Sequence, residues 1–229
     1  MSEERKRILV TGGSAGIGAA VVERLRRAGH GVWAASRRLE NDAARRTLKM
    51  DAWEESDVEA AFDFLVEHEG GLDALVISHG GGNFEPVESL EASALVFDIQ
   101  SHIVGTLFCL RAAARVMERG DIVVIGSIAS TQAFPECGGY SAAKAGQRLL
   151  TLTAAEELRE KNLRVSLLHP GAVDTAIWDS REGFDRSKMM RPDDVARSVE
   201  HVLNAPDAAH VLEMTILPRS GTLDTEEGS

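Results

Sequence analysis

Tyr140 and Lys144 are the two residues whose types and spacing best suit chemistry. They stand four residues apart in Gly138–Lys144 (GGYSAAK), which leads into an Ala- and Leu-rich stretch typical of a helix. On a helix, residues four apart share one face. A phenol has an ordinary pKa of about 10, and a nearby ammonium lowers that pKa because it stabilises the phenolate. We therefore predict a proton shuttle; the alternative is a Tyr and a Lys that merely share an exposed helix face.

Alternating strand and helix patterns must position this pair. Expected strands cover residues 8–10, 32–35, 47–50, 72–77, 122–125, 165–168 and 211–217, and a long helix is expected at 93–119. The strands are almost continuously apolar, which is typical of strands buried on both faces. The alternation predicts an α/β fold with one doubly wound parallel sheet of about seven strands and helices on both faces.

Ligands of such sheets bind beyond the carboxyl ends of the strands. Five residues fall at those expected ends: Gly12, Asp51, Ser78, Ser127 and Gly171. The first end opens into a glycine-rich turn, Thr11–Gly18 (TGGSAGIG), followed by a helical pattern. Glycines there let a pyrophosphate approach the backbone at a helix N-terminus, although a plain glycine-rich turn is the alternative.

Three motifs in this order resemble the short-chain dehydrogenase/reductase family. They are TGGSAGIG at 11–18, Ser127 thirteen residues before YSAAK at 140–144, and PGAVDT at 170–175. The resemblance extends from about residue 7 to 217. It implies a Rossmann fold, a nicotinamide cofactor and hydride transfer between an alcohol and a carbonyl compound.

The resemblance also implies roles for individual residues. Tyr140 moves the proton of the substrate oxygen, Lys144 lowers the pKa of Tyr140 and holds the nicotinamide ribose, and Ser127 hydrogen-bonds the substrate oxygen. The implied cofactor contacts, besides Tyr140 and Lys144, are Gly12, Ser14, Gly16, Ile17, Gly18, Asp51, Ser78, Gly80, Pro170, Gly171, Val173 and Thr175. Simpler roles stay open: Ser127 as a strand-end cap, Asp51 as a helix N-cap, and Pro170-Gly171 as an ordinary turn.

The end of the second expected strand bears on the choice of cofactor. NAD enzymes usually carry an acidic residue there that holds the ribose 2′-hydroxyl. This chain has Ser36, Arg37 and Arg38 and no carboxylate. Arg pairs well with a 2′-phosphate, so we predict NADP(H) in preference to NAD(H), with a solvated basic turn as the alternative.

Two departures from the family pattern leave room for a rival function. The usual Asn-Asn-Ala-Gly segment is Ile77–Gly80 here, with only its glycine kept, and His102 stands where an Asn usually supports a proton relay. A histidine can join a relay or be a satisfied helix residue. The rival is therefore a non-catalytic nucleotide-binding sensor or scaffold of the same fold. An epimerase or dehydratase of the longer related branch fits less well, because this chain is short and its glycine spacing differs.

The substrate region is expected at residues 174–191, as a lid, with residues 128–139 opposite it. A partly apolar pocket is indicated by Ala133, Phe134, Ile177, Trp178, Phe184 and Met189. Arg181 and Arg186 either bind a carboxylate or are simply solvated. The partner we predict is a small alcohol or carbonyl substrate.

Composition sets the outer limits. The 229 residues carry a net charge of −11 and two distant cysteines, which argues against nucleic acid and favours a reducing, cytoplasmic compartment. No apolar run approaches the roughly 20 residues of a membrane span, so no membrane partner is predicted. We expect no metal site and one domain over residues 1–229, with flexible tails at 1–6 and 219–229. The resemblance implies a homodimer or homotetramer.

Overall fold

A computed structural model describes residues 5–221. Most of the two predicted tails, residues 1–4 and 222–229, lies outside the described residues. Lys6, which we assigned to the N-terminal tail, is held in place. Its ammonium lies 3.2 Å from the buried carboxylate of Asp121, and its backbone N–H donates to the ring of His30. Lys6 thus contacts the domain, and the flexible tails stay a prediction.

Seven parallel strands form one sheet in the order β3-β2-β1-β4-β5-β6-β7, as the strand pattern predicts. The strands are β1 (Arg7–Thr11), β2 (Gly31–Ser36), β3 (Thr47–Lys49), β4 (Ala74–Ile77), β5 (Gly120–Ile125), β6 (Leu163–Pro170) and β7 (Glu213–Ile216). The order reverses between β1 and β4, and the connections that follow these two strands lead to helices on opposite faces of the sheet, which leaves room for a ligand.

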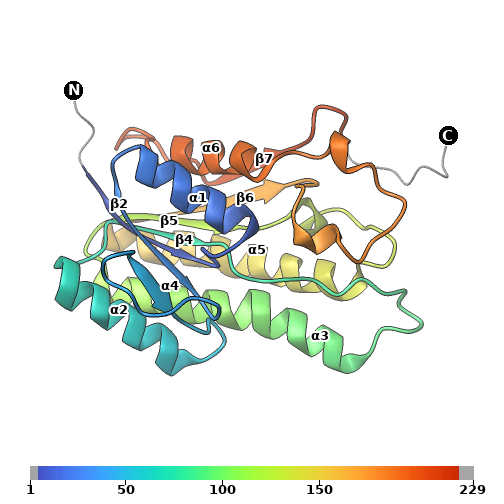
Figure 1. The fold of residues 1–229 in the computed structure, drawn as a ribbon, viewed down its shortest axis with the longest axis horizontal. Coiled ribbons are helices and arrows are strands. Elements are labelled where there is room, and N and C mark those ends of the chain that lie inside the picture. The colour runs from blue at the N-terminus through green and yellow to red at the C-terminus, as the bar shows by residue number, and fades with distance from the viewer. Residues whose placement is uncertain (1–4, 222–229) are drawn as a thin grey trace.

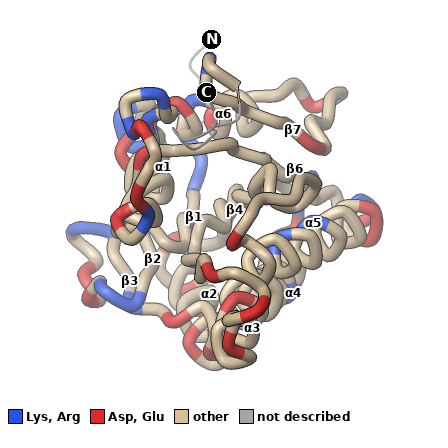
Figure 2. Tube along the Cα trace, turned by 90° about the vertical axis from the view of Figure 1, so that its right-hand side faces the viewer, with Lys and Arg blue, Asp and Glu red and all other residues tan. Residues whose placement is uncertain are grey.

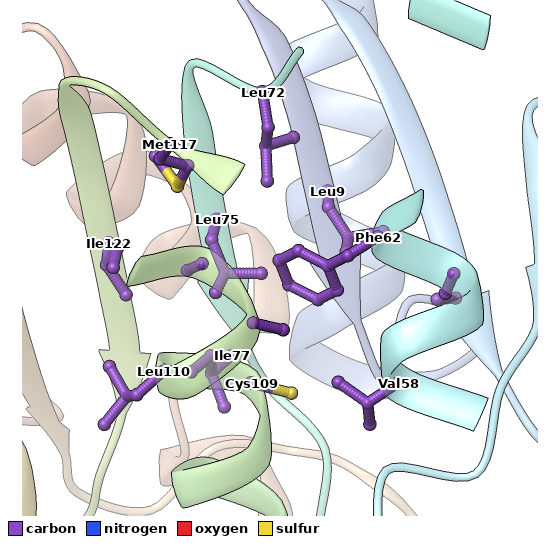
Figure 3. Close-up of a cluster of buried hydrophobic side chains, with 14 of the residues drawn as sticks. Leu9, Val58, Phe62, Leu72, Leu75, Ile77, Cys109, Leu110, Met117 and Ile122 are labelled. Atoms are coloured by element: carbon purple, nitrogen blue, oxygen red, sulfur yellow. The ribbon is translucent and has the colours of Figure 1, made fainter. Parts of the chain in front are cut away.

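Helices cover both faces of the sheet (Figure 1). One face carries α1 (Gly16–Arg27) and α6 (Pro192–Leu203), and the other carries α2 (Glu55–Glu69), α3 (Ala92–Ile99), α4 (Gly105–Val116) and α5 (Gly138–Leu158). Each face has its own apolar core. Figure 3 shows the core under α2 and α4, where Phe62 lies beside Leu9 and Leu75. Burial of such side chains contributes about 1.5–3 kcal/mol each, so the sheet is a rigid base for its loops.

The helix expected at 93–119 runs from Ala92 to Val116 and contains a π-helical turn, η1 (Gln100–Val104). This helix has the length and the mean hydropathy, 1.4, of a membrane span, which corrects the expectation that no such run exists. Its buried face nevertheless carries Asp98 and His102 and packs against the domain. The run is therefore a core helix of this fold.

Charged residues of both signs occur on many elements (Figure 2). Acidic residues outnumber basic ones but are dispersed, and basic residues occur beside β3. This distribution is typical of a solvated surface rather than a single electrostatic docking face.

Candidate active site

The glycine-rich turn after β1 borders a cavity of about 500 Å³ at the carboxyl edge of the sheet. Helix α1 starts at this cavity with Ala15 as N-cap, which gives no side-chain cap, and with no acidic residue in the first turn. Its first N–H groups are thus available to an anion. Gly16 has a φ of +52°, a conformation that side chains other than glycine rarely adopt. The turn suits the pyrophosphate of a dinucleotide.

The structure brings most of the predicted cofactor contacts to this cavity. Lining it are Gly12, Ser14, Gly16, Ile17, Ser36, Arg37, Arg38, Asp51, Ser78, Gly80, His102, Tyr140, Lys144 and Thr175. Pro170, Gly171, Val173 and Ser127 instead line a neighbouring cavity. Gly18 lines neither; a Cβ there would lie 2.3 Å from the carbonyl oxygen of Gly12. Gly18 therefore permits the close packing of helix on turn.

The basic end of the cavity lies beyond β2. The guanidinium carbon of Arg37 lies 4.3 Å from the centre of the Trp53 ring, and Arg38 donates its backbone N–H to the hydroxyl of Ser36. Asp51 accepts the N–H of Trp53 at 3.1 Å, whereas the N-cap of α2 is Glu54, so Asp51 is not the helix cap. The residues present fit an adenosine carrying an extra phosphate, because two guanidinium groups face this end and the only carboxylate among the cavity's lining residues is that of Asp51.

Tyr140 and Lys144 lie on the first turns of α5, with both side chains at the cavity. The Lys144 ammonium donates to the backbone oxygen of Ile125 at 3.1 Å and to the side-chain oxygen of Gln147 at 2.9 Å. Gln147 is oriented in turn by donating to Thr106 at 2.9 Å. The ammonium lies 5.8 Å from the centre of the Tyr140 ring.

The protonation of this pair differs from the prediction. Burial raises the pKa of Tyr140 to about 12, and a hydrogen bond with Ser127 opposes that rise. Burial lowers the pKa of Lys144 to about 7, and the charge of Asp98 opposes that fall. The pKa of Tyr140 is thus raised in this structure and not lowered as expected, because desolvation of the phenolate outweighs the hydrogen bond with Ser127.

Ser127 has the simpler of the two roles that the sequence left as alternatives. Its hydroxyl accepts the N–H of Ala129 at 3.1 Å, as a cap of the short turn after β5. The same hydroxyl interacts with the phenol of Tyr140. Ser127 therefore lies beside Tyr140 with its orientation set by the backbone, and its role toward a substrate stays a prediction.

His102 occupies the π-helical turn and is almost fully buried. Its ring lies edge-on to Tyr140, with 5.4 Å between the centres, and its Nε2 lies 2.7 Å from the backbone oxygen of Gly81. Since that oxygen only accepts, Nε2 carries the proton. A Cβ at Gly80 would lie 2.3 Å from the imidazole, so the glycine that survives from the family segment makes room for the larger ring.

Several buried polar atoms, one of them on this ring, have no hydrogen-bond partner. Within residues 5–221, five buried side-chain atoms have no hydrogen-bond partner: His79 Nε2, Asp98 Oδ2, Ser101 Oγ, His102 Nδ1 and Ser141 Oγ. Burial is the main cause that lowers the pKa of His79, to about 3, and of His102, well below its usual value. Both imidazoles are therefore neutral at physiological pH.

The neighbouring cavity, of about 650 Å³, is the candidate substrate pocket. Ser127 and Tyr140 form one wall, and the predicted lid forms another through Ile177, Trp178 and Phe184. Phe134 lines the pocket as expected, whereas Ala133 and Met189 are not among its lining residues. The base of the lid is closed by a backbone bond from Asp174 to Met190 at 2.8 Å.

Sequence reasoning missed several residues at the two cavities. Trp53, His79 and Phe97 line the first, and Phe84 lines the second. Glu136 and Cys137 also line the second, and they belong to the segment 128–139 that was expected opposite the lid. Trp53 and His79 follow expected strand ends by one or two residues, which is a usable signal. Asp98 and Gln147 gave none, because they sit within helical patterns that predict burial but not contacts.

Comparison with known proteins agrees with the architecture. A family model described as short chain dehydrogenase matches residues 6–184. The chain belongs to this family and is thus an oxidoreductase of a class that uses a nicotinamide cofactor. The fold and the family resemblance predicted from the sequence are confirmed.

Individual relatives cover most of the chain. The chain is similar to sepiapterin reductase of Chlorobaculum tepidum, with 31% identity over 183 residues that cover 79% of this chain and 75% of that protein. It is 29% identical to L-2,3-butanediol dehydrogenase of Corynebacterium glutamicum, over 75% of this chain and 73% of that one. Among solved structures, an alcohol dehydrogenase of Thermococcus sibiricus complexed with 5-hydroxy-NADP has a TM-score of 0.85 and 26% identity, covering 96% of this chain and all of that chain.

Proposed function

We propose that this protein transfers hydride between NADP(H) and a small alcohol or carbonyl compound, with Tyr140 as the acid and base. The observation that carries the proposal is the position of Tyr140, which lines both the cofactor cavity and the substrate pocket. A proton donor at that boundary serves a reaction in which a substrate meets a cofactor. A module that only binds a nucleotide has no need of it.

Each step assigned to the protein is a proton or hydrogen-bond step. A bound nicotinamide supplies the hydride that reduces the carbonyl carbon. Tyr140, protonated because burial raises its pKa to about 12, donates its proton to the carbonyl oxygen as negative charge develops there. Ser127 donates a hydrogen bond to the same oxygen, and its backbone-held orientation avoids reorganisation.

Lys144 acts on the phenol of Tyr140 from a distance of 5.8 Å between its ammonium and the ring centre. Its two acceptors, the Ile125 carbonyl and Gln147, hold the ammonium in a buried position and stabilise its charged form. The ammonium in turn favours the phenolate that remains after proton transfer. His102 is neutral and holds Gly81, which supports a positioning role for it rather than a charged one.

The preference for NADP(H) rests on Ser36, Arg37 and Arg38 at the end of β2. Arginines there pair with a 2′-phosphate, while the ribose hydroxyl of NAD(H) lacks its usual acidic partner. Arg37→Ala is expected to weaken NADPH binding about tenfold or more and to leave NADH binding within about twofold, as measured by titration of cofactor fluorescence. Equal losses for both cofactors would contradict the preference.

The catalytic role of Tyr140 is tested by Tyr140→Phe. Loss of the proton donor should lower kcat by about 10²–10⁴-fold with a panel of aldehydes and ketones, followed through NADPH absorbance. NADPH affinity should stay unchanged, because the ring is kept. Tight NADPH binding without turnover in either protein would instead support the non-catalytic sensor.

Several coarser properties belong to the same proposal. The family implies a small-molecule substrate, and we place the protein in the cytoplasm as a homodimer or homotetramer. Val96, Ile99, Leu107 and Leu149 are exposed apolar side chains on α3, α4 and α5, which supports pairing through these helices. Analytical ultracentrifugation of the full chain tests the assembly; a monomer at micromolar concentration contradicts it.

A further inference from the structure

Arg181 is a desolvated cation in the lid. Its side chain is only 12% exposed, and its guanidinium carbon lies 4.6 Å from the ring centre of Phe84, 4.9 Å from that of Phe184 and 5.4 Å from that of Trp178. Aromatic rings stabilise a cation through their faces. They offer nothing to its N–H groups, which need acceptors in their own plane.

The acceptors that the chain offers these N–H groups are weak or distant. One N–H group donates to the Cys137 sulfur, a weak acceptor, at 3.6 Å, and a Glu136 carboxylate oxygen lies 3.6 Å from another guanidinium nitrogen. Charge-assisted bonds between guanidinium and carboxylate are about 2.7–2.9 Å long. Glu136 is also half-exposed, so water competes for its carboxylate.

The second arginine of the lid shows the contrast. Arg186 donates to Asp174 at 2.6 Å and to Asp179 at 2.7 Å, and it is half-exposed. It does not line the substrate pocket. The sequence left open whether Arg181 and Arg186 bind a carboxylate. The N–H groups of Arg186 are bonded to carboxylates of the lid, whereas those of Arg181 can still donate to a ligand.

Arg181 directs that capacity to the reaction centre. Within the described part of the chain, it is the only Lys or Arg that lines the pocket of Ser127 and Tyr140. The Phe84 ring contacts both groups: its centre lies 5.5 Å from the ring centre of Tyr140 and 4.6 Å from the guanidinium carbon of Arg181. A substrate of a few carbons with its oxygen at Tyr140 can therefore extend past Phe84 to Arg181.

We propose that Arg181 binds a carboxylate of the substrate, so that the carbonyl substrates are oxo acids with a few carbons between the carbonyl and the carboxylate. This inference rests on the proposed function of the same site. The substrate carboxylate replaces the distant Glu136 and forms a bidentate pair with the guanidinium, which is itself largely shielded from water. Phe84 and Phe184 then contact the intervening carbons.

The test compares unbranched ω-oxo carboxylates of four to eight carbons with their methyl esters. The wild-type enzyme is expected to favour the acid at the best length by about 10–100-fold in kcat/KM, mainly through KM. Arg181→Gln should abolish this preference, because it lowers kcat/KM for the acids far more than for the esters. Arg181→Lys should restore part of the preference, because the charge is kept without the planar fork.

Glu136→Gln provides the matched opposite change. It removes the carboxylate that competes for Arg181, so it is expected to lower KM for the acids and leave the esters unaffected. Equal kcat/KM for acids and esters in the wild type at every length would overturn the inference. So would equal losses for acids and esters in Arg181→Gln and Arg181→Lys, which would show a purely structural role. Unfolding curves identify any variant that fails to fold, and the Glu136→Gln arm then decides.

A binding experiment separates this inference from the proposed function. Calorimetry of the NADPH complex with hexanoate and with hexanamide needs no turnover. If the wild type binds hexanoate but not hexanamide, and Arg181→Gln binds neither, the carboxylate site is supported even if no carbonyl compound is reduced. Turnover of esters without a preference for acids, and without hexanoate binding, overturns the carboxylate site and leaves the oxidoreductase proposal standing.

Discussion

The two cavities at the carboxyl edge of the sheet are built in different ways. The cofactor cavity lies directly on strand ends and on the glycine turn, where backbone packs on backbone: a Cβ at Gly12 would lie 2.6 Å from the carbonyl oxygen of Ser78. The substrate pocket is enclosed by loops and a lid, whose contacts are largely between side chains, such as Arg186 with Asp174 and Asp179.

The difference concerns how each wall tolerates change. A wall made of close backbone contacts permits one residue at a position, because any added atom moves a strand or a helix. A wall made of side-chain pairs permits exchange of one pair for another without disturbing the sheet. A common cofactor site and a variable substrate site can therefore belong to one fold.

Two glycine substitutions test this comparison with the largest expected effect. Gly18→Ala places a Cβ 2.3 Å from the Gly12 carbonyl oxygen, so helix α1 must shift, and the free energy of unfolding should fall by about 3 kcal/mol. NADPH affinity should fall with it. Urea unfolding and cofactor titration measure the two quantities.

Gly183→Ala in the lid is the matched control. Gly183 has a φ of +80°, but no atom lies within 4 Å of an added Cβ. Only backbone strain is added, and the free energy of unfolding should fall by about 1 kcal/mol with NADPH affinity unchanged. If the lid substitution cost as much as Gly18→Ala, the distinction between the two walls would be wrong.

The sequence predicts the rigid half well. Strand ends, glycines and the spacing of Ser127, Tyr140 and Lys144 are local patterns, and a parallel sheet brings strand ends together whatever the loops do. The sequence predicts the burial around Tyr140 and Lys144 poorly. The raised pKa of Tyr140 depends on how completely neighbouring segments exclude water, and spacing along a helix carries no such information.

The π-helical turn and the lid show the same limit. The spacing of apolar residues does not distinguish an α-helix from an α-helix that contains a π-helical turn. Gln100–Val104 was therefore expected to be α-helical. The distinct tasks of Arg181 and Arg186 depend on their partners, some of which, such as Phe84, are far away in the sequence. Such pairings follow from the folded loops and not from residue types.

Asp98 gives a prediction of intermediate size for the rigid half. Its carboxylate is buried, it pairs with Asn83 at 3.1 Å, and its charge raises the pKa of both Tyr140 and Lys144. Asp98→Asn removes that charge with little change in shape. The pKa of Tyr140 should fall from about 12, and that of Lys144 from about 7.

The single tyrosine of this chain makes the measurement direct. Tyrosinate absorbance during a pH titration reports Tyr140 alone. In Asp98→Asn the tyrosinate is expected to form at a lower pH than in the wild type. The nearby imidazoles of His79 and His102 stay neutral throughout that titration and add no compensating charge. The alkaline limb of the pH–activity profile should also move to lower pH in Asp98→Asn, because the Lys144 ammonium loses its proton at a lower pH. An unchanged or higher tyrosine pKa would show that Asp98 acts through packing alone.

The smallest effect is expected in the lid. Arg186→Gln breaks ion pairs with Asp174 and Asp179 that are largely open to water, so salt and solvent already weaken them and the free energy of unfolding should not change measurably. The lid loses its fixed shape, however, and KM for the substrate should rise by about twofold to fivefold at unchanged NADPH affinity. High salt should raise the wild-type KM toward the variant's value, since screening weakens the same pairs. A change in NADPH affinity as large as that in KM would mean that the lid and the cofactor wall act as one unit, and the two-part description of this active site would fail.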